Sequence, residues 1–387
     1  MADDTRQHAA SATCDEASPS SIAPWPFVII DDANNLQIDH AASPYEPFSK
    51  RRRLNGNIVV ENEVGLCDKM AACLQAIGSR KLPLPPPPKP QPVPLLAAIV
   101  RSQQGIDFPL QRVAMPKRLS TPLLFCSLVH NDGSDDDAYV EALGVRWLIP
   151  PRSAFSLCHS RRWHELAPLR PPGGYRLISL DPPWHSKSRG IRYETSDKKA
   201  ILADLVPAIE ALACKTACLL AVWITNNRAV QDFVEEVLFP RCGAAIIGRW
   251  YWAKLAADGS GWASGGDPYS PHRKPWEPLL LGLIGGAKGG VLSGEATRAT
   301  GRGAACGGAA LPLARRLVVC SVPRVHSAKP SLDGLLSAAA PQLLGRPDLT
   351  KAEAWRLLPK LECYAREAKQ EWHAIGNEAL MFQRSTS

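Results

Sequence analysis

The sequence has no apolar run long enough to cross a membrane. Apolar stretches such as 219–224 and 279–284 fall far short of the roughly 20 residues that a membrane-spanning helix needs. The start of the chain also lacks the basic residues and the apolar segment of a secretory signal peptide. Both absences predict an intracellular protein that is not inserted in a membrane.

A regular cysteine framework is missing as well. The eleven cysteines are scattered at irregular spacing, which favours reduced thiols. Cys214 and Cys218 are four residues apart, but no second ligand pair accompanies them, so no metal site is predicted. The Gly- and Ala-rich segment 285–310 lacks the strand–turn–helix pattern of a phosphate-binding loop, and we expect a surface insertion there.

Charge of either sign is not strongly in excess. Lys and Arg number 45 against 37 Asp and Glu, a formal net charge of +8. This balance permits a polyanionic partner such as nucleic acid but does not demand one. The basic cluster Lys50–Arg53 is compatible with a nuclear import signal, with a phosphate-binding patch or with a solvated charge run.

The composition divides the chain into two parts. Residues 1–94 form an N-terminal extension that begins with a polar segment, 1–22, expected to be disordered. The extension ends in the proline-rich stretch 82–94, which is typical of a semi-rigid linker. Between them, Phe27–Ile30 is typical of a strand or a docking segment, and Asp68–Ile77 of a short helix. Residues 95–387 are expected to form the main domain, and we expect the function of that domain not to need 1–94.

Apolar strands and amphipathic helices alternate after residue 145. The run 217–224 is continuously apolar, as in a strand buried on both faces, and the apolar spacing over 230–238 is helical. Further strands are expected at 177–180, 244–255, 279–284, 317–321 and 361–365, and further helices at 202–213 and 332–344. This alternation predicts an α/β fold with a largely parallel, doubly wound sheet.

The tetrapeptide Asp181-Pro182-Pro183-Trp184 directly follows the strand predicted at 177–180. Open α/β sheets place their chemistry at the carboxyl ends of strands. The two prolines fix their own φ angles and restrict the residues before them, so the turn holds a carboxylate and an indole rigidly. Such a turn suits a planar base that bears an amino group. The alternative is an ordinary proline-rich turn.

Several further segments accompany this tetrapeptide in a defined order. They are Trp147–Ser153, Trp223–Asn226, Phe233–Pro240, Trp250–Lys254, Pro271–Glu277, Ser321–Pro323, His326–Pro330 and Gly376–Glu378. With the tetrapeptide, they resemble the adenine N6-methyltransferases related to the 70-kilodalton catalytic subunit of the mRNA adenosine methyltransferase. Within that family the chain is most similar to the methyltransferase-like protein 4 branch. The resemblance covers roughly residues 145–383.

The resemblance implies a Rossmann-like, mostly parallel seven-stranded sheet that binds S-adenosyl-L-methionine. The motif order is permuted, because the catalytic tetrapeptide precedes the cofactor-binding strand, here 361–366. Catalysis is assigned to Asp181, Pro182, Pro183 and Trp184. Cofactor contacts are assigned to Cys158, His159, Asp181, Lys329, Arg366, Asn377 and Glu378. Contacts to nucleic acid are expected from Lys187, Arg189, Arg192, Tyr193, His272, Arg273 and Lys274.

The implied reaction moves a methyl group to N6 of adenine. Asp181 and a backbone carbonyl of the proline turn would accept hydrogen bonds from the amine, so that its lone pair points at the methyl group. Trp184 and Tyr193 are the candidates for stacking on the base. No metal is needed. The resemblance implies RNA, such as small nuclear RNA that can be 2′-O-methylated, or DNA as the partner. We lean slightly to RNA because a single-stranded adenine needs the least unstacking.

Departures from the branch leave a second hypothesis open. Cys158-His159 stand where the branch usually offers an acidic residue, and Glu367 stands where an asparagine is usual. A carboxylate beside the cofactor's negatively charged tail would weaken binding if it pointed inward. The chain could therefore be a non-catalytic nucleic-acid-binding partner of another methyltransferase. A protein partner is compatible with the sequence but not implied by it. A nuclear location is expected, with the cytoplasm as the alternative.

Overall fold

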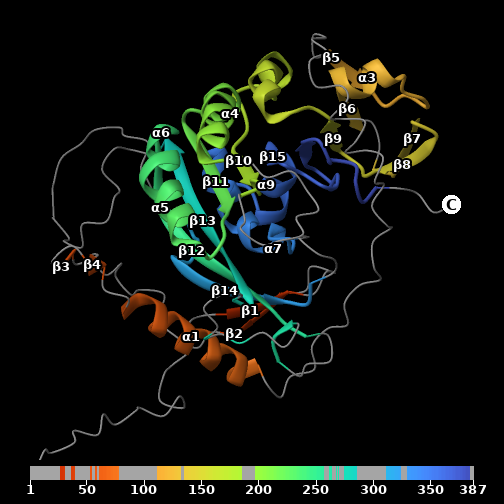
Figure 1. Cartoon of the computed structure of the whole chain (residues 1–387). Helices are drawn as coiled ribbons and strands as arrows, with labels where there is room; N and C mark the ends of the chain where they lie inside the picture. Colours follow the sequence, from red (N-terminus) through yellow and green to blue (C-terminus); the bar gives the residue numbers. More distant parts are fainter. Residues whose placement is uncertain are drawn as a thin grey trace, which may run out of the picture.

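The structure is a computed structural model of the whole chain (Figure 1). It describes residues 27–30, 36–39, 53–54, 57–58, 61–77, 111–131, 135–184, 197–256, 261–263, 267, 269, 274–285, 311–323 and 329–383. The predictions for 1–22, for the proline-rich linker and for nearly all of the Gly- and Ala-rich insertion lie outside these residues, as does most of the basic cluster, of which only Arg53 is described.

Twelve of the described strands form one sheet. In spatial order they are β2 (Leu36–Asp39), β1 (Phe27–Ile30), β14 (Arg316–Ser321), β12 (Ala244–Lys254), β13 (Trp276–Gly285), β11 (Ala217–Trp223), β10 (Leu177–Leu180), β15 (Lys360–Cys363), β16 (His373–Ile375), β9 (Ser153–Ser156), β6 (Ser127–Asn131) and β5 (Gln111–Ala114). Most neighbouring strands run parallel, while β13 runs antiparallel between β11 and β12. The predicted mostly parallel α/β sheet is confirmed. The described sheet has twelve strands rather than the implied seven: β1, β2, β5 and β6 come from residues before 145, and eight strands come from residues after it.

Helices cover both faces of the sheet (Figure 1). One face carries η2 (Ser160–Leu169), α4 (Lys198–Leu212), α5 (Arg228–Phe233), the π-helical turn η3 (Val234–Leu238) and α6 (Phe239–Arg241). The other carries α7 (Asp333–Leu336), η5 (Ser337–Ala339), α8 (Ala340–Leu344) and α9 (Lys351–Leu357). Successive strand residues point to opposite faces, so Leu177 and Ile178 of β10 belong to different core clusters. This double cover explains the continuous apolar run predicted for β11.

Smaller elements complete the described chain. Helix α3 (Thr121–Cys126) precedes β6, and β7 (Ala138–Ala142) pairs with β8 (Val145–Ile149) in a separate hairpin. β3 (Arg53–Leu54) pairs with β4 (Asn57–Ile58). No helix in the described part of the chain is both long and apolar enough to span a membrane.

Described segments of the N-terminal extension pair with the twelve-stranded sheet or pack against it. β1 pairs parallel with β14, with Phe27 opposite Val318, so the strand prediction for 27–30 holds. Helix α1 (Glu61–Ile77) begins before its predicted start and buries Met70 and Cys73 against the ends of three sheet strands. At these described segments the extension packs against the domain that follows it.

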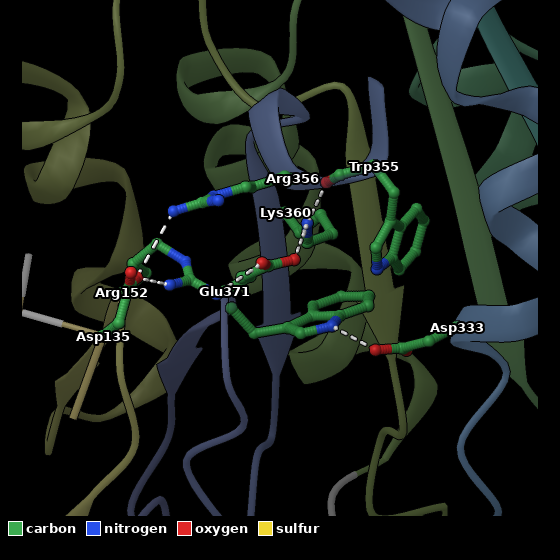
Figure 2. Close-up of polar contacts among 8 residues, drawn as sticks. Asp135, Arg152, Asp333, Trp355, Arg356, Lys360 and Glu371 are labelled. Atoms are coloured by element: carbon green, nitrogen blue, oxygen red, sulfur yellow. Dashed lines mark hydrogen bonds and ion pairs between the residues drawn. The ribbon is translucent and has the colours of Figure 1, made fainter. Parts of the chain in front are cut away.

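A network of ion pairs ties three strands together at their amino ends (Figure 2). The side chain of Lys360, at the start of β15, is fully buried, and its Nζ lies 3.5 Å from Glu371 Oε2. Glu371 is also 3.0 Å from Arg152 Nη2, and Asp135 pairs with both Arg152 and Arg356. Burial outweighs the attraction of Glu371 and lowers the pKa of Lys360 to about 8. This network lies at the edge of the sheet opposite Asp181.

Candidate active site

The parallel strands bring the predicted site residues to one edge of the sheet. β10, β15, β16 and β9 run in the same direction, so their carboxyl ends lie side by side. Antiparallel β13 brings its amino end to this edge. The residues that follow or end these strands are Asp181 to Trp184 after β10, Arg366 after β15, Asn377 and Glu378 after β16, Cys158 and His159 after β9, and Glu277 on β13. The edge therefore gathers side chains from distant parts of the sequence.

Four charged side chains form a row at the centre of this edge. Lys329 Nζ lies 3.3 Å from Asp181 Oδ1 and 2.6 Å from Glu277 Oε2. The other oxygen of Glu277 pairs with Lys254 Nζ. The exposed fractions of the four side chains lie between 14% and 27%. Carboxylates and ammonium groups alternate along the row, so its charges balance. We call these four residues the charge row.

Electrostatic attraction within the charge row keeps Lys329 and Glu277, which lie near Asp181, in their charged forms. Burial raises the pKa of Asp181 above its ordinary value, and Lys329 opposes this rise. Burial also works against a charged Lys329, but Asp181 and Glu277 outweigh it and raise the pKa of Lys329. Burial likewise favours neutral Glu277, yet Lys329 and Lys254 lower the pKa of Glu277 to about 2. Lys329 and Glu277 are therefore both charged at neutral pH.

Sequence reasoning found half of the charge row. It named Asp181 and Lys329 and missed Lys254 and Glu277. Lys254 and Glu277 are the last residues of segments 250–254 and 271–277, which carried the family resemblance. This position was the sequence signal that could have identified them. Their role depends on the pairing of β12 with β13, which places their backbones together at the site edge.

Trp184 supports the turn Asp181–Trp184 from inside the core. Its side chain is buried, and its Nε1 donates a hydrogen bond of 2.9 Å to the carbonyl oxygen of Trp223. Its ring meets the ring of Phe233 edge-on at 6.3 Å between centroids. The backbone N–H of Trp184 donates to the carbonyl of Pro182 at 2.8 Å. In this arrangement the indole is not available to stack on a base, contrary to the expectation, and it fixes the turn instead.

The loop after β16 lies against the end of β15. The N–H of Gly376 donates to Ser156 O at 3.1 Å, and Gly376 has φ +152°. A Cβ at this position would lie 3.1 Å from Ala365 N and 3.2 Å from the Cα of Tyr364, so only glycine fits without displacement. Glycine thus allows the following two residues to approach the end of β15.

Asn377 and Glu378 follow this glycine at the site edge. Glu378 Oε2 lies 3.0 Å from Arg366 Nε, which joins two of the predicted cofactor residues. The Arg366 guanidinium also lies over the ring of Phe382, at 5.0 Å from its centroid. Asn377 Oδ1 is buried and has no hydrogen-bond partner among the described residues. A buried acceptor without a partner is unfavourable in the free protein and suits a bound hydroxyl or N–H group.

Cys158 and His159 lie at the same edge but are engaged locally. The Cys158 thiol is buried, accepts a hydrogen bond from Ser156 Oγ, and has its pKa raised to about 11 by burial. His159 caps η2 by accepting from the N–H of Arg161 at 3.3 Å. Neither residue supplies the carboxylate that the related branch usually has there.

A second buried ion pair lies beside the charge row and was also missed. Lys369 Nζ is 2.8 Å from Glu362 Oε2, and both side chains are mostly buried. Burial disfavours the charged lysine, but Glu362, Asp333 and Asp181 together raise the pKa of Lys369. Lys369 therefore adds a cation close to Asp181, two residues after the unusual Glu367, which is itself partly buried.

The predicted nucleic-acid contacts fall mostly outside the described residues. Lys187, Arg189, Arg192, Tyr193, His272 and Arg273 are all among the residues not described. Lys274 is described, and its Nζ lies 3.5 Å from Cys67 Sγ and 5.5 Å from the centroid of the Trp276 ring. Within the described ranges, no group of three or more His, Cys, Asp or Glu side chains is placed to hold a metal ion.

The fold and this edge define an α/β protein with a mostly parallel, doubly wound sheet and a cluster of charged side chains at the carboxyl ends of its strands. Residues 175–378, more than half of the chain, match the MT-A70 family model, and the chain belongs to the MT-A70 family. The resemblance inferred from the sequence is thereby confirmed. The family match includes the charge row, Arg366, Asn377 and Glu378.

The relatives whose names state a nucleic-acid substrate include an RNA methyltransferase and a DNA methyltransferase. The chain is 30% identical to human "N(6)-adenine-specific methyltransferase METTL4" over 267 residues, covering 67% of this chain and 48% of that protein. It is 29% identical to "N6-methyladenosine RNA methyltransferase MTA1" of Pyricularia oryzae, covering 64% and 58%. It is 25% identical to "DNA N6-methyl methyltransferase" of Caenorhabditis elegans, covering 74% and 67%. The chain spans about half the length of the METTL4 relatives it matches.

Proposed function

We propose that this chain is an S-adenosyl-L-methionine-dependent methyltransferase that modifies N6 of adenine in nucleic acid. The observation that carries the proposal is the charge row, in which Asp181 of the tetrapeptide is held 3.3 Å from Lys329 at the strand edge. The names of the relatives, which cover both RNA and DNA methylation, support adenine as the target.

The site residues fit the chemistry of this cofactor. Its methionyl end carries an ammonium and a carboxylate, which match the alternating carboxylates and lysines around Asp181 and Lys329. Its ribose hydroxyls match the buried, unpartnered Asn377 Oδ1 and the carboxylate of Glu378. The bound cofactor supplies an electrophilic methyl group on a sulfonium.

Asp181 and the proline turn orient the amine of the target base. The Asp181 carboxylate accepts one N6–H, and Lys329 opposes the rise in the pKa of Asp181 that burial causes. The Pro182 carbonyl already accepts from Trp184 and has a second lone pair for the other N6–H. These two acceptors turn the nitrogen lone pair towards the methyl group. The raised pKa of Asp181 also suits it to accept the proton that the amine releases after transfer.

Cofactor binding distinguishes this proposal from the non-catalytic alternative. Calorimetry with S-adenosyl-L-methionine should give a dissociation constant of about micromolar or tighter for the wild-type chain. Lys329→Ala should weaken binding, whereas Asp348→Ala, at an exposed aspartate in the loop before α9, should leave it unchanged. Wild-type protein that is folded and binds no cofactor would favour the non-catalytic nucleic-acid-binding partner.

The nature of the nucleic acid is a finer proposal. We favour RNA, since a single-stranded or looped adenine costs least to unstack. Matched single-stranded RNA, 2′-O-methylated RNA, single-stranded DNA and duplex DNA should be compared for N6-methyladenine by mass spectrometry. Faster methylation of DNA than of every RNA would reverse the preference. A nuclear location, supported by the basic cluster Lys50–Arg53, is proposed with either substrate.

A further inference from the structure

Helix α1 packs against the ends of the strands that carry the charge row. Its buried residues Cys67, Met70 and Cys73 belong to one apolar cluster with sheet residues from β14, β12 and β13. The sheet and loop members of this cluster are Tyr251, Ala253, Leu255, Trp262, Trp276, Val318 and Cys320. Figure 1 shows α1 lying beside β14, far in sequence from the strands that it covers.

The alternation of side chains along a strand relates α1 directly to the charge row. Ala253 and Trp276 face α1, and each precedes a charge-row residue, Lys254 or Glu277. Consecutive strand residues point to opposite faces of a sheet. Helix α1 therefore packs on the face of β12 and β13 opposite to the Lys254–Glu277 ion pair. The N–H of Lys254 donates to the carbonyl of Pro275 at 2.9 Å, which closes the two strand ends. A shift of Trp276 or Ala253 would therefore move the charge row.

Two polar contacts fasten α1 to the connection between β12 and β13. Tyr269 Oη donates to Asp68 Oδ1 at 2.9 Å, and Lys274 Nζ donates to Cys67 Sγ at 3.5 Å. The ring of Trp262 in that connection lies 6.3 Å, between centroids, from the ring of Trp276 at the start of β13. Asp68 and Cys67 are neighbours on α1, so one turn of the helix holds two points of the connection.

We propose that α1 is a positioning element of the active site. It fixes the ends of β12 and β13 and, through Trp276 and Ala253, the ion pair of Glu277 with Lys254. Glu277 in turn pairs with Lys329. Residues 61–77 are then needed for full cofactor affinity, although they lie in the N-terminal extension and outside the family match. The functional part of this inference rests on the proposed function, whereas its structural part can be measured without any cofactor.

A bland alternative is that α1 only covers an apolar surface. In that case its loss would lower the stability of the whole domain, and no strand end would be affected more than another. The two cases differ in where the backbone opens, which hydrogen exchange measures for each segment.

The experiment uses the full chain with single substitutions on α1 and its partner. Met70→Ala removes the fully buried side chain at the centre of the α1 contact, and Met70→Leu restores its volume. Tyr269→Phe removes only the hydrogen bond to Asp68. Gln75→Ala, on the exposed side of α1, is the matched control. Hydrogen exchange is followed at 250–256 and 274–279 and, for reference, at 360–363 in β15.

The proposal expects local opening at the β12 and β13 ends. Met70→Ala should lower amide protection at 250–256 and 274–279 by about tenfold or more while 360–363 keeps its protection. The cofactor dissociation constant of Met70→Ala should rise several-fold. Tyr269→Phe should show a smaller loss of amide protection in the same segments. Met70→Leu and Gln75→Ala should match wild type.

Two results would overturn the proposal: equal loss of protection in all three segments, or unchanged protection in folded Met70→Ala. If the wild-type chain bound no cofactor, the proposed function would fail, and the exchange pattern would still decide the role of α1.

Discussion

Replacing Glu277 by glutamine removes one charge from the row without removing its bulk. In the wild type, Lys329 and Lys254 lower the pKa of Glu277 from an ordinary 4.5 to about 2. The gap between these values corresponds to about 3 kcal/mol of stabilisation, present above pH 4.5 and lost as the pH falls towards 2. The side chain is only 25% exposed, so solvent screening is limited. Glu277→Gln should therefore lower the free energy of unfolding by about 3 kcal/mol at pH 7.

Urea denaturation followed by tryptophan fluorescence measures this loss at pH 7 and again near pH 3. The difference in unfolding free energy between wild type and Glu277→Gln should shrink at the lower pH, because wild-type Glu277 then begins to be protonated and its charge stabilises the fold less. Glu210→Gln, at an exposed glutamate on α4, is the control and should stay within about 0.5 kcal/mol of wild type. A Glu277→Gln protein as stable as wild type at pH 7 would refute the reasoning, as would a difference that does not depend on pH.

Three further predictions concern pH and local geometry. The rate of methyl transfer should rise with pH through a pKa above the ordinary 3.8 of an aspartate, because burial raises the pKa of Asp181. The pH profile of the limiting rate checks this. An observed pKa at or below 3.8 would contradict the prediction. The pKa of buried Lys360 is lowered from 10.5 to about 8, so the stability of wild type relative to Lys360→Met should increase by about 3 kcal/mol between pH 7.5 and pH 10.5. A stability difference between these two proteins that does not depend on pH would show that burial does not lower the pKa of Lys360. Gly376→Ala should weaken cofactor binding in calorimetry because its Cβ meets the backbone at 3.1 Å, and unchanged affinity would mean that the loop after β16 does not form the cofactor site.

The sequence was sufficient for the parts of the site that depend on local chemistry. Asp181 and its turn could be found because two prolines, a carboxylate and an indole after an apolar strand are contiguous. Lys329 and Asn377 came only from the family resemblance, since nothing in their local sequence sets them apart. Trp184 was identified as part of the turn, but its burial depends on Trp223 and Phe233, which belong to other elements.

The missed features depend on contacts between distant segments. Glu277 reaches the site because β13 runs antiparallel, and one sequence contains no direct record of strand direction. Helix α1 meets its partners across about 200 residues, as in the contact of Asp68 with Tyr269. Its apolar spacing over 68–77 predicts a buried face but not the surface that buries it. Composition suggested a separate extension, whereas packing joins it to the sheet.

The central claim is that Asp181 directs a methyl group to N6 of adenine. The most direct test incubates the full chain with S-adenosyl-L-methionine and an adenine-containing oligonucleotide and measures N6-methyladenine by mass spectrometry. Asp181→Asn keeps the shape of the side chain but removes its charge. The account predicts that wild type forms N6-methyladenine and that Asp181→Asn is slower by about 10²- to 10⁴-fold. Equal rates for the two proteins, or methylation of a position other than N6, would contradict it.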